Sequence, residues 1–315
     1  MSFLSAVVLG IVQGFTEFLP VSSSGHLVLG QVLLGVKDPG LSFAVWAHLG
    51  TTAATVVFLW SEITWLLRGL VSRSPVPSRA GTGTRSSPRW TADARLRAPF
   101  EAAGRTGGKR AGWRYAARAC KDPWRVAGLV LLGSLPAALV GLTLKDHIER
   151  AFSSPVPASL GLLFTGFVLF FYGLREGRRA LEGQAAEPFA TVNWGRALLA
   201  GVAQAVAILP GISRSGMTIV AGACSGMDRE DAARFSFFLA LVAVTGAALL
   251  DARSAMAAGM PILTAVNLVG AAAAFFSGLV ALGLVFRTVR KGSFSAFAYY
   301  CWAVGLVGLF ISLHR

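Results

Sequence analysis

Residues 10–29 read GIVQGFTEFLPVSSSGHLVL and place polar groups inside an otherwise apolar stretch. Glu17 is the only charge in it. A lone carboxylate in hydrophobic sequence is costly to bury and usually marks a functional site. Gln13 precedes it by one helical turn, on the same face, and Pro20 ends the helix before three serines, a glycine and a histidine. The stretch therefore predicts a helix, a polar break and a second helix.

A second stretch repeats this layout far along the chain. Residues 208–219 read ILPGISRSGMTI, again an apolar approach, a proline, hydroxyls, a glycine and an apolar exit. Setting residues 22–25 beside residues 213–216 matches serine, serine and glycine, and places Arg214 opposite Ser23. This similarity indicates an internal repeat.

The composition indicates a polytopic membrane protein. The mean hydropathy is +0.62, and 54% of the 315 residues are hydrophobic against 14% charged, which leaves too little polar surface for a soluble fold of this size. The net charge of +14 would suggest nucleic acid in a soluble protein. Here the basic residues concentrate between apolar segments, as the positive-inside rule expects, so we predict no nucleic-acid partner.

Two kinds of apolar segment are present. Residues 2–36 and 195–226 each hold two apolar pieces around a break, and a piece such as 24–36 covers only about half of a bilayer. These segments predict hairpins of two broken helices that enter the membrane, whose breaks line a cavity. Full spans are expected at 41–61, 126–144, 157–174, 235–250, 262–286 and 295–313.

The order of these segments predicts an inverted repeat. Three spans follow each hairpin, and an odd number of crossings inserts the second half upside down. We therefore expect an all-α polytopic membrane protein with an inverted-topology repeat, each half a re-entrant broken-helix hairpin plus three transmembrane helices. The chain 1–315 would form a single membrane domain, with repeat one at about 1–174 and repeat two at about 195–313.

Residues 69–124 differ from the rest in composition. Arg, Ser, Pro, Gly and Thr dominate this segment, which predicts a disordered basic insertion on the cytoplasmic side. With this segment inside, most of the 29 Lys and Arg residues lie in cytoplasmic loops, and both termini face outward.

The two breaks predict an anion site. At each break a short helix starts after a hydroxyl-rich turn, so free backbone N–H groups and the positive helix end point into the membrane interior. Ser22, Ser23 and Ser213 can serve simply as helix caps. Arg214 needs an anionic partner, and its planar fork suits either phosphate oxygens or the Glu17 carboxylate.

These groups are the parts needed for phosphoryl transfer. Arg214 can stabilise charge, Ser23 can act as nucleophile, and His26 or Glu17 can act as base or acid. Gln13 and Glu17 can instead hold a divalent cation. His48, in the expected span 41–61, either faces the interior with a functional role or only packs. The residues alone do not separate a hydrolase from a transporter or flippase of an anionic polyprenyl-phosphate lipid.

Two motifs resemble one family closely. Residues 13–26, QGFTEFLPVSSSGH, and residues 210–218, PGISRSGMT, are similar to the signature motifs of the bacterial undecaprenyl-diphosphate phosphatases, the bacitracin-resistance family. The likeness covers about 1–67 and 126–313. It implies an enzyme of the bacterial plasma membrane that converts undecaprenyl diphosphate to undecaprenyl phosphate, with Mg²⁺ or Ca²⁺ and a site open to the outer side. Such an enzyme recycles the carrier lipid for peptidoglycan synthesis and confers bacitracin resistance.

The resemblance also implies roles for single residues. Glu17 matches the essential acid, Ser23 the proposed nucleophile and His26 the essential histidine. Arg214 belongs to the phosphate-binding motif, and we expect its neighbours and the hydroxyls of the first break to contribute: Ser22, Ser24, Gly211, Ser213, Ser215 and Thr218.

The chain departs from the family pattern in places. Many relatives have Glu where this chain has Gln13, which weakens the case for a cation held by two carboxylates. The insertion at 69–124 is a second departure. The acid-phosphatase-like lipid phosphatases also use Ser-Gly-His and Ser-Arg pairs, but they need a histidine soon after the Ser-Arg pair, and the next one here is His314. The sequence leaves open whether two copies form a homodimer.

Overall fold

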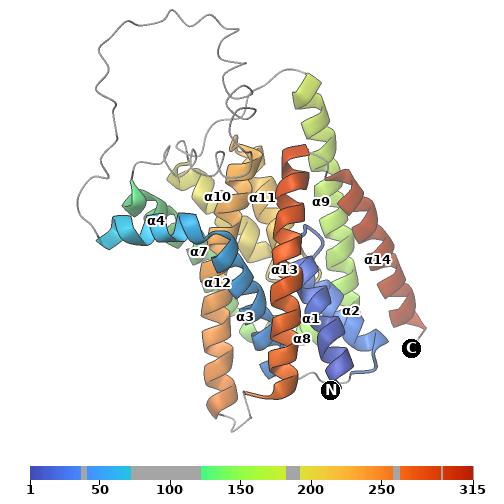
Figure 1. The fold of residues 1–315 in the computed structure, drawn as a ribbon. Helices are drawn as coiled ribbons and strands as arrows, with labels where there is room; N and C mark the ends of the chain where they lie inside the picture. Colours follow the sequence, from blue (N-terminus) through green and yellow to red (C-terminus); the bar gives the residue numbers. More distant parts are fainter. Residues whose placement is uncertain (37–40, 72–121, 182–191, 258–262, 292–293, 315) are drawn as a thin grey trace, which may run out of the picture. The chain divides into compact units, whose positions relative to one another are not determined.

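The computed structural model describes residues 1–36, 41–71, 122–181, 192–257, 263–291 and 294–314 (Figure 1). These residues form two compact units, one of residues 1–60 and 128–315 and the other of residues 61–127. The predicted insertion at 69–124 falls mostly in residues 72–121, outside the described residues. The candidate site lies in the first unit.

The described residues are helical almost throughout, as the sequence predicts. The helices are α1 (Phe3–Phe18), α2 (Ser23–Leu33), α3 (Leu41–Phe58), α4 (Trp60–Val71), α7 (Pro123–Thr143), α8 (Lys145–Phe152), α9 (Pro155–Leu181), α10 (Trp194–Val206), α11 (Arg214–Cys224), α12 (Arg229–Ala257), α13 (Ala265–Lys291) and α14 (Ser295–Leu313).

The first break forms where the sequence predicts it. Helix α1 begins after Ser2, whose hydroxyl accepts a hydrogen bond from the Ser5 backbone N–H at 3.1 Å. It ends before Pro20, because the proline disfavours a helical residue ahead of it, and Leu19 is accordingly extended. Ser22 then adopts a φ of +67°, a left-handed conformation that is costly for a residue with a Cβ. The chain thereby turns sharply into α2.

The second break has the same construction. Helix α10 begins after Asn193, whose side-chain oxygen accepts from the Arg196 backbone N–H at 2.9 Å. It ends at Val206, and the chain passes through Pro210 and Gly211 to α11. Gly211 has a φ of +86°, which only glycine adopts at little cost.

Small residues bring α13 close to the N-terminal helices. A Cβ built on Gly10 would meet the backbone of Gly270, and one built on Gly50 would meet the backbone of Ala271. Helices α1 and α3 therefore both pack on α13 at short range, as small residues allow inside membranes (Figure 1).

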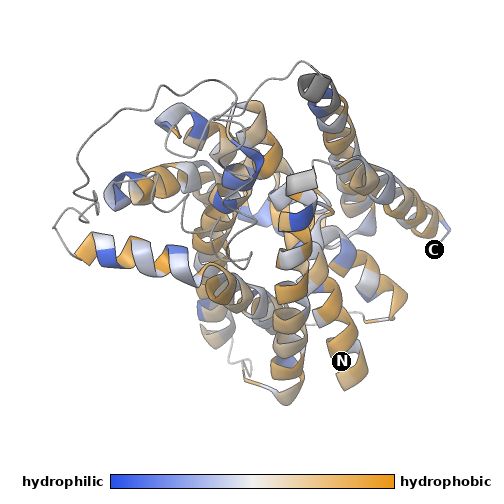
Figure 2. Cartoon of the chain, turned by 45° about the horizontal axis from the view of Figure 1, so that its top comes forward, coloured by the Kyte–Doolittle hydropathy of each residue, from blue (hydrophilic) through white to orange (hydrophobic). Residues whose placement is uncertain are grey.

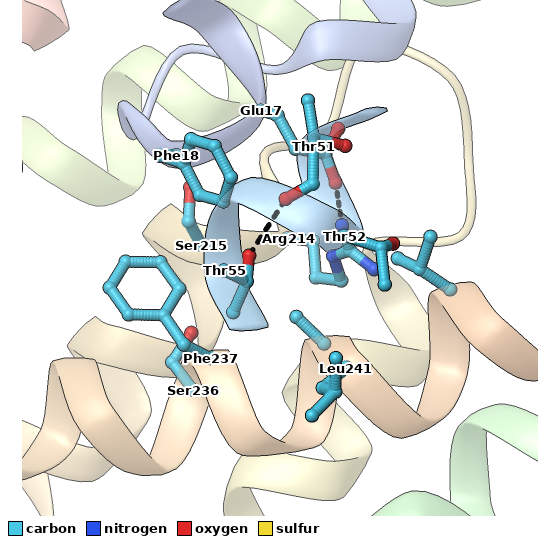
Figure 3. A pocket seen from close by; sticks show the side chains of 12 residues that line it. Glu17, Phe18, Thr51, Thr52, Thr55, Arg214, Ser215, Ser236, Phe237 and Leu241 are labelled. Atoms are coloured by element: carbon cyan, nitrogen blue, oxygen red, sulfur yellow. Dashed lines mark hydrogen bonds and ion pairs between the residues drawn. The ribbon is translucent and has the colours of Figure 1, made fainter. Parts of the chain in front are cut away.

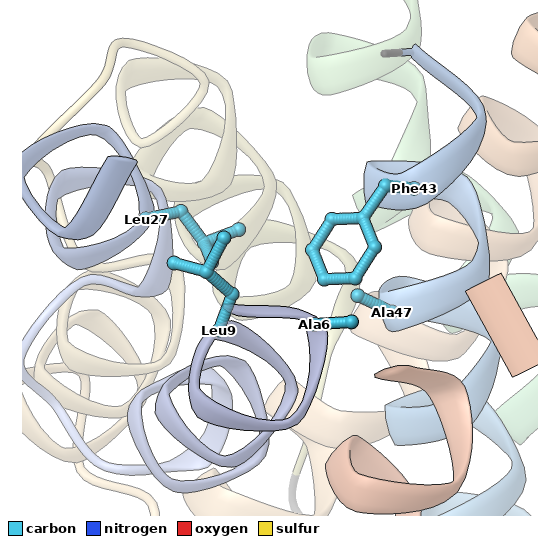
Figure 4. Close-up of a cluster of buried hydrophobic side chains, with 5 residues drawn as sticks. All are labelled: Ala6, Leu9, Leu27, Phe43 and Ala47. Atoms are coloured by element: carbon cyan, nitrogen blue, oxygen red, sulfur yellow. The ribbon is translucent and has the colours of Figure 1, made fainter. Parts of the chain in front are cut away.

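A hydrophobic cluster joins the first three helices. Ala6 and Leu9 of α1, Leu27 of α2, and Phe43 and Ala47 of α3 pack together and are buried (Figure 4). This cluster lies within the first repeat that the sequence predicts. The cluster holds α2 and α3 against α1. It thereby also holds in place the first break, which lies between α1 and α2.

The apolar helices agree closely with the expected spans. Five helices (α7, α9, α12, α13 and α14) are long and apolar enough to cross a membrane, among the described residues. A sixth span exists only if α3 and α4 count as one. The single unbroken span predicted for residues 41–61 is wrong in this respect, because α3 ends at Phe58 and α4 begins at Trp60.

Polarity is distributed as a lipid environment requires. Many large apolar side chains are exposed, for example Leu131, Phe171, Phe276 and Phe310. Figure 2 shows that hydrophobic residues make up much of the helices. By contrast, a set of polar side chains is buried, including Gln13, Glu17, Thr51, Thr55, Thr165, Ser213, Ser215, Thr218 and Ser236. A lipid-facing exterior needs no polar surface, while buried polar groups must find partners within the protein. The chain is therefore a multi-pass membrane protein with a polar centre.

Replacing Gly211 tests the tight packing of the second break. Its φ is left-handed and a Cβ would collide with the Ala158 carbonyl of α9, so Gly211→Ala should destabilise the protein by about 1–3 kcal/mol. Gly283→Ala on α13 is the control, since a Cβ there would meet no atom within 4 Å beyond the neighbouring backbone of its own helix. Thermal unfolding in detergent should give a lower midpoint for Gly211→Ala only. Equal midpoints would contradict this packing.

Candidate active site

Ser22 and Ser23 have different roles at the first break. Ser22 is the cap of α2, because its hydroxyl accepts from the Gly25 backbone N–H at 3.3 Å. Ser23 is the first residue of α2, and its hydroxyl donates to Glu17 Oε2 at 2.6 Å. The capping role considered for Ser23 thus belongs to Ser22, and the Ser23 hydroxyl is directed at the carboxylate.

A threonine from another helix satisfies the second break. Ser213 caps α11 by accepting from the Gly216 backbone N–H at 3.1 Å. The Thr165 hydroxyl of α9 accepts from the Ser213 backbone N–H and donates to the Gly211 carbonyl, both at 3.0 Å. Backbone groups that leave the helical pattern in a membrane interior need such partners. Thr165 therefore holds the loop that presents Arg214.

The two breaks pack directly on each other. The Ser24 hydroxyl accepts from the Gly211 backbone N–H at 3.2 Å, and the Ser215 hydroxyl donates to the Leu19 carbonyl at 3.1 Å. Each break thus binds the backbone of the other through one serine. Segments almost two hundred residues apart therefore form a single polar centre.

Glu17 and Arg214 form a partly buried ion pair at this centre (Figure 3). The side chain of Glu17 is 4% exposed and that of Arg214 is 21% exposed. Arg214 Nη2 donates to Glu17 Oε1, while Oε2 accepts from Ser23 and from Gln13 Nε2, the latter at 2.8 Å. Three donors thus surround the carboxylate, which supplies the counter-charge that a partly buried guanidinium requires.

A pocket opens beside this ion pair (Figure 3). One part of its lining carries the charges and hydroxyls of Glu17, Arg214, Thr51, Thr52, Thr55, Ser215 and Ser236. The other part is apolar and consists of Phe18, Phe237, Ala240, Leu241 and Val244. Such a lining suits an anionic head group attached to an apolar chain, because hydroxyls and a guanidinium bind phosphate oxygens and the apolar residues bind hydrocarbon.

His26 lies apart from the pocket. Its Nδ1 is 2.7 Å from the Ser22 carbonyl, which can only accept, so Nδ1 carries the proton. Nε2 then accepts from the Tyr300 hydroxyl of α14 at 2.9 Å, and the two rings stack with centroids 5.5 Å apart. A catalytic role for His26 stays a prediction, and it requires Tyr300 to release Nε2.

The other predicted phosphate-binding residues hold the site together. Thr218 donates to the Arg214 carbonyl at 2.8 Å and contacts the Ser236 hydroxyl. Ser22 and Ser213 act as caps, while Ser24 and Gly211 bond to each other. Of this group, Ser215 lines the pocket with Arg214. Direct phosphate binding by the remainder stays a prediction.

The described residues do not fit a cation held jointly by Gln13 and Glu17. Gln13 directs its NH₂ group at the carboxylate, and its Oε1 is buried without a hydrogen-bond partner. Joint coordination would need the amide to turn over and lose its bond to Glu17.

Several site residues were not predicted. Thr51 and Thr55 are four residues apart in an apolar helix, so both hydroxyls lie on one face. This spacing could have indicated a polar, inward-facing side of the helix. Thr165, Ser236 and Tyr300 give no comparable signal in the sequence, and only the tertiary contacts identify them.

Comparisons with known proteins agree on one family. A family profile described as bacitracin resistance protein BacA matches residues 6–307. A protein of Desulforapulum autotrophicum named undecaprenyl-diphosphatase is 38% identical over 98% of this chain and 98% of its own length. Proteins of the same name from Syntrophotalea carbinolica and Methanosphaera stadtmanae are 39% and 34% identical, each over 99% of both chains.

Proposed function

The chain belongs to the bacitracin resistance protein BacA family, and we propose from this that it is an undecaprenyl-diphosphatase. As a membrane hydrolase it releases the terminal phosphate of undecaprenyl diphosphate and returns the carrier lipid to cell-wall synthesis. The observation that carries the proposal is the partly buried cluster of Glu17, Ser23 and Arg214 beside a pocket that is part polar and part apolar.

The cluster suits a two-step displacement. In the first step, Ser23 Oγ attacks the terminal phosphorus, its proton passes to Glu17 Oε2 at 2.6 Å, and the bond to the lipid phosphate breaks. Undecaprenyl phosphate leaves as an anion, so this step needs no acid at neutral pH. Water then attacks the phosphoserine, the bond between phosphorus and Ser23 Oγ breaks, Oγ takes back the proton from Glu17, and inorganic phosphate leaves. Arg214 stabilises the charge that builds up on the phosphoryl oxygens.

We further propose that the chain is an inverted repeat, in which the two breaks are equivalent. The break contacts occur in matched pairs: Ser22 and Ser213 are the caps, and Ser24 and Ser215 each bind the backbone of the opposite break. Such reciprocity is expected of two halves related by a pseudo-twofold axis.

The helices that approach the breaks are also matched. A Cβ on Gly10 of α1 would meet the backbone of Gly270 on α13, and one on Gly201 of α10 would meet the backbone of Gly133 on α7. These pairs support α1 and α10 as equivalent re-entrant helices, and α13 and α7 as equivalent spans. The excess of Lys and Arg between the apolar segments supports cytoplasmic loops and outward-facing termini. A site open to the outer side is proposed from the family resemblance.

Phosphate release from purified protein tests the activity. Wild-type protein in detergent should release inorganic phosphate from undecaprenyl diphosphate. Arg214→Lys keeps the charge but loses the planar fork, so its turnover should fall by on the order of a hundredfold. Ser23→Ala should abolish turnover. Arg253→Lys, on the exposed part of α12, is the control and should keep wild-type turnover.

Two results would contradict this proposal. A folded wild-type protein that binds the lipid without releasing phosphate would point to a transporter. Full activity of Ser23→Ala would remove serine from the nucleophilic role and leave water as the attacking group.

Removal of divalent cations is a separate test. The family resemblance predicts a need for Mg²⁺ or Ca²⁺, and we propose that oxygens of the diphosphate would supply ligands to the ion, because hard cations prefer oxygen ligands. A chelator should therefore stop turnover, and added Mg²⁺ or Ca²⁺ should restore it. Turnover that a chelator leaves unchanged would remove the cation from the reaction.

A further inference from the structure

Gln13 is held between two partners at the centre of the protein. Its side chain is fully buried, and its Nε2 lies 2.8 Å from Glu17 Oε2 and 2.9 Å from His48 Nδ1. His48 comes from α3 and is 35% exposed at its side chain. A chain of contacts thus runs from His48 through Gln13 to the carboxylate that accepts the Ser23 proton.

The chemistry of these groups decides which atom donates. The atom of Gln13 that faces the Glu17 carboxylate must be the amide nitrogen, because an amide oxygen there would place two acceptors together. The same nitrogen faces His48 Nδ1, and an amide nitrogen only donates. His48 Nδ1 therefore accepts, and His48 carries its ring proton on Nε2.

We propose that His48 is a positioning residue for the hydrolysis, which acts through Gln13 on Glu17. By accepting the second amide proton of Gln13, it prevents the amide from turning over and presenting its oxygen to the carboxylate. Glu17 Oε2 then stays oriented toward Ser23 Oγ. The effect of His48 on catalysis rests on the proposed function. The arrangement of the three side chains does not depend on that function.

A purely packing role for His48 predicts different behaviour. If the ring only filled space, Phe would replace it best, because Phe keeps the ring and loses the nitrogen. If the acceptor matters, Asn would replace it best, because its Oδ1 can occupy the place of Nδ1. The two roles therefore rank the same two variants in opposite order.

Steady-state kinetics with undecaprenyl diphosphate separate these roles. His48→Phe should lower kcat about tenfold and leave KM within about twofold, since one hydrogen bond that orients a reacting group is lost. His48→Asn should stay within about threefold of wild-type kcat. Val57→Leu, on an exposed position of the same helix, is the control and should match the wild type. If the Phe variant does not fold, His48→Leu replaces it.

A double-mutant cycle shows whether His48 acts through Gln13. In a Gln13→Leu background the same His48→Phe change should alter kcat by less than about twofold, because the amide that it positions is absent. An equal loss in both backgrounds would show that His48 acts without Gln13 and would overturn the inference. A His48→Asn variant as inactive as His48→Phe would overturn it too.

The tautomer of His48 supplies a readout that needs no turnover. In ¹⁵N-histidine-labelled protein, with the signal assigned by its absence in His48→Asn, the spectrum should show an unprotonated Nδ1 and a protonated Nε2. A proton on Nδ1 would overturn the inference even in an active enzyme. Wild-type protein with the predicted tautomer but no phosphate release would overturn the proposed function instead, and leave the arrangement of Gln13 established.

Discussion

The ion pair of Glu17 and Arg214 is the interaction on which the rest of the structure depends. Burying either charge alone in a membrane interior would cost much free energy, and each charge is stable there only beside the other. Because Glu17 lies at the end of α1 and Arg214 at the start of α11, the pair can form only where the two helix breaks meet. The need to neutralise two buried charges therefore brings the two parts of the chain together.

The polar groups around the pair follow from the same constraint. Breaking a helix inside a membrane leaves backbone N–H and carbonyl groups that need partners. Ser24, Ser215 and Thr165 supply these partners across the junction. The same arrangement leaves Ser23 directed at the carboxylate and a hydroxyl-lined pocket beside the guanidinium. The elements that make the breaks stable are thus the elements that can bind a lipid diphosphate and attack it.

The sequence predicts the helices and the two breaks from strong local signals, and charge balance makes Glu17 one of two possible partners of Arg214, the other being phosphate. Pro20 and Pro210 mark the breaks, and a charged residue in apolar sequence demands a partner. The roles of Tyr300 and Thr165 could not be predicted, because a single hydroxyl in an apolar helix gives no indication of what it faces. His26 shows the same limit, since its partner at Tyr300 is 274 residues away.

The most direct test of the shared centre is a stability cycle on the ion pair. Thermal unfolding in detergent would be measured for Glu17→Gln, Arg214→Gln and the double variant. Each single change leaves one buried charge without its partner and should destabilise the protein by on the order of 3–5 kcal/mol. The stability loss of the double variant should be far smaller than the sum of the two single losses. The double variant should also be more stable than at least one of the single variants. Additive effects would contradict the central claim that the two breaks are joined by this pair.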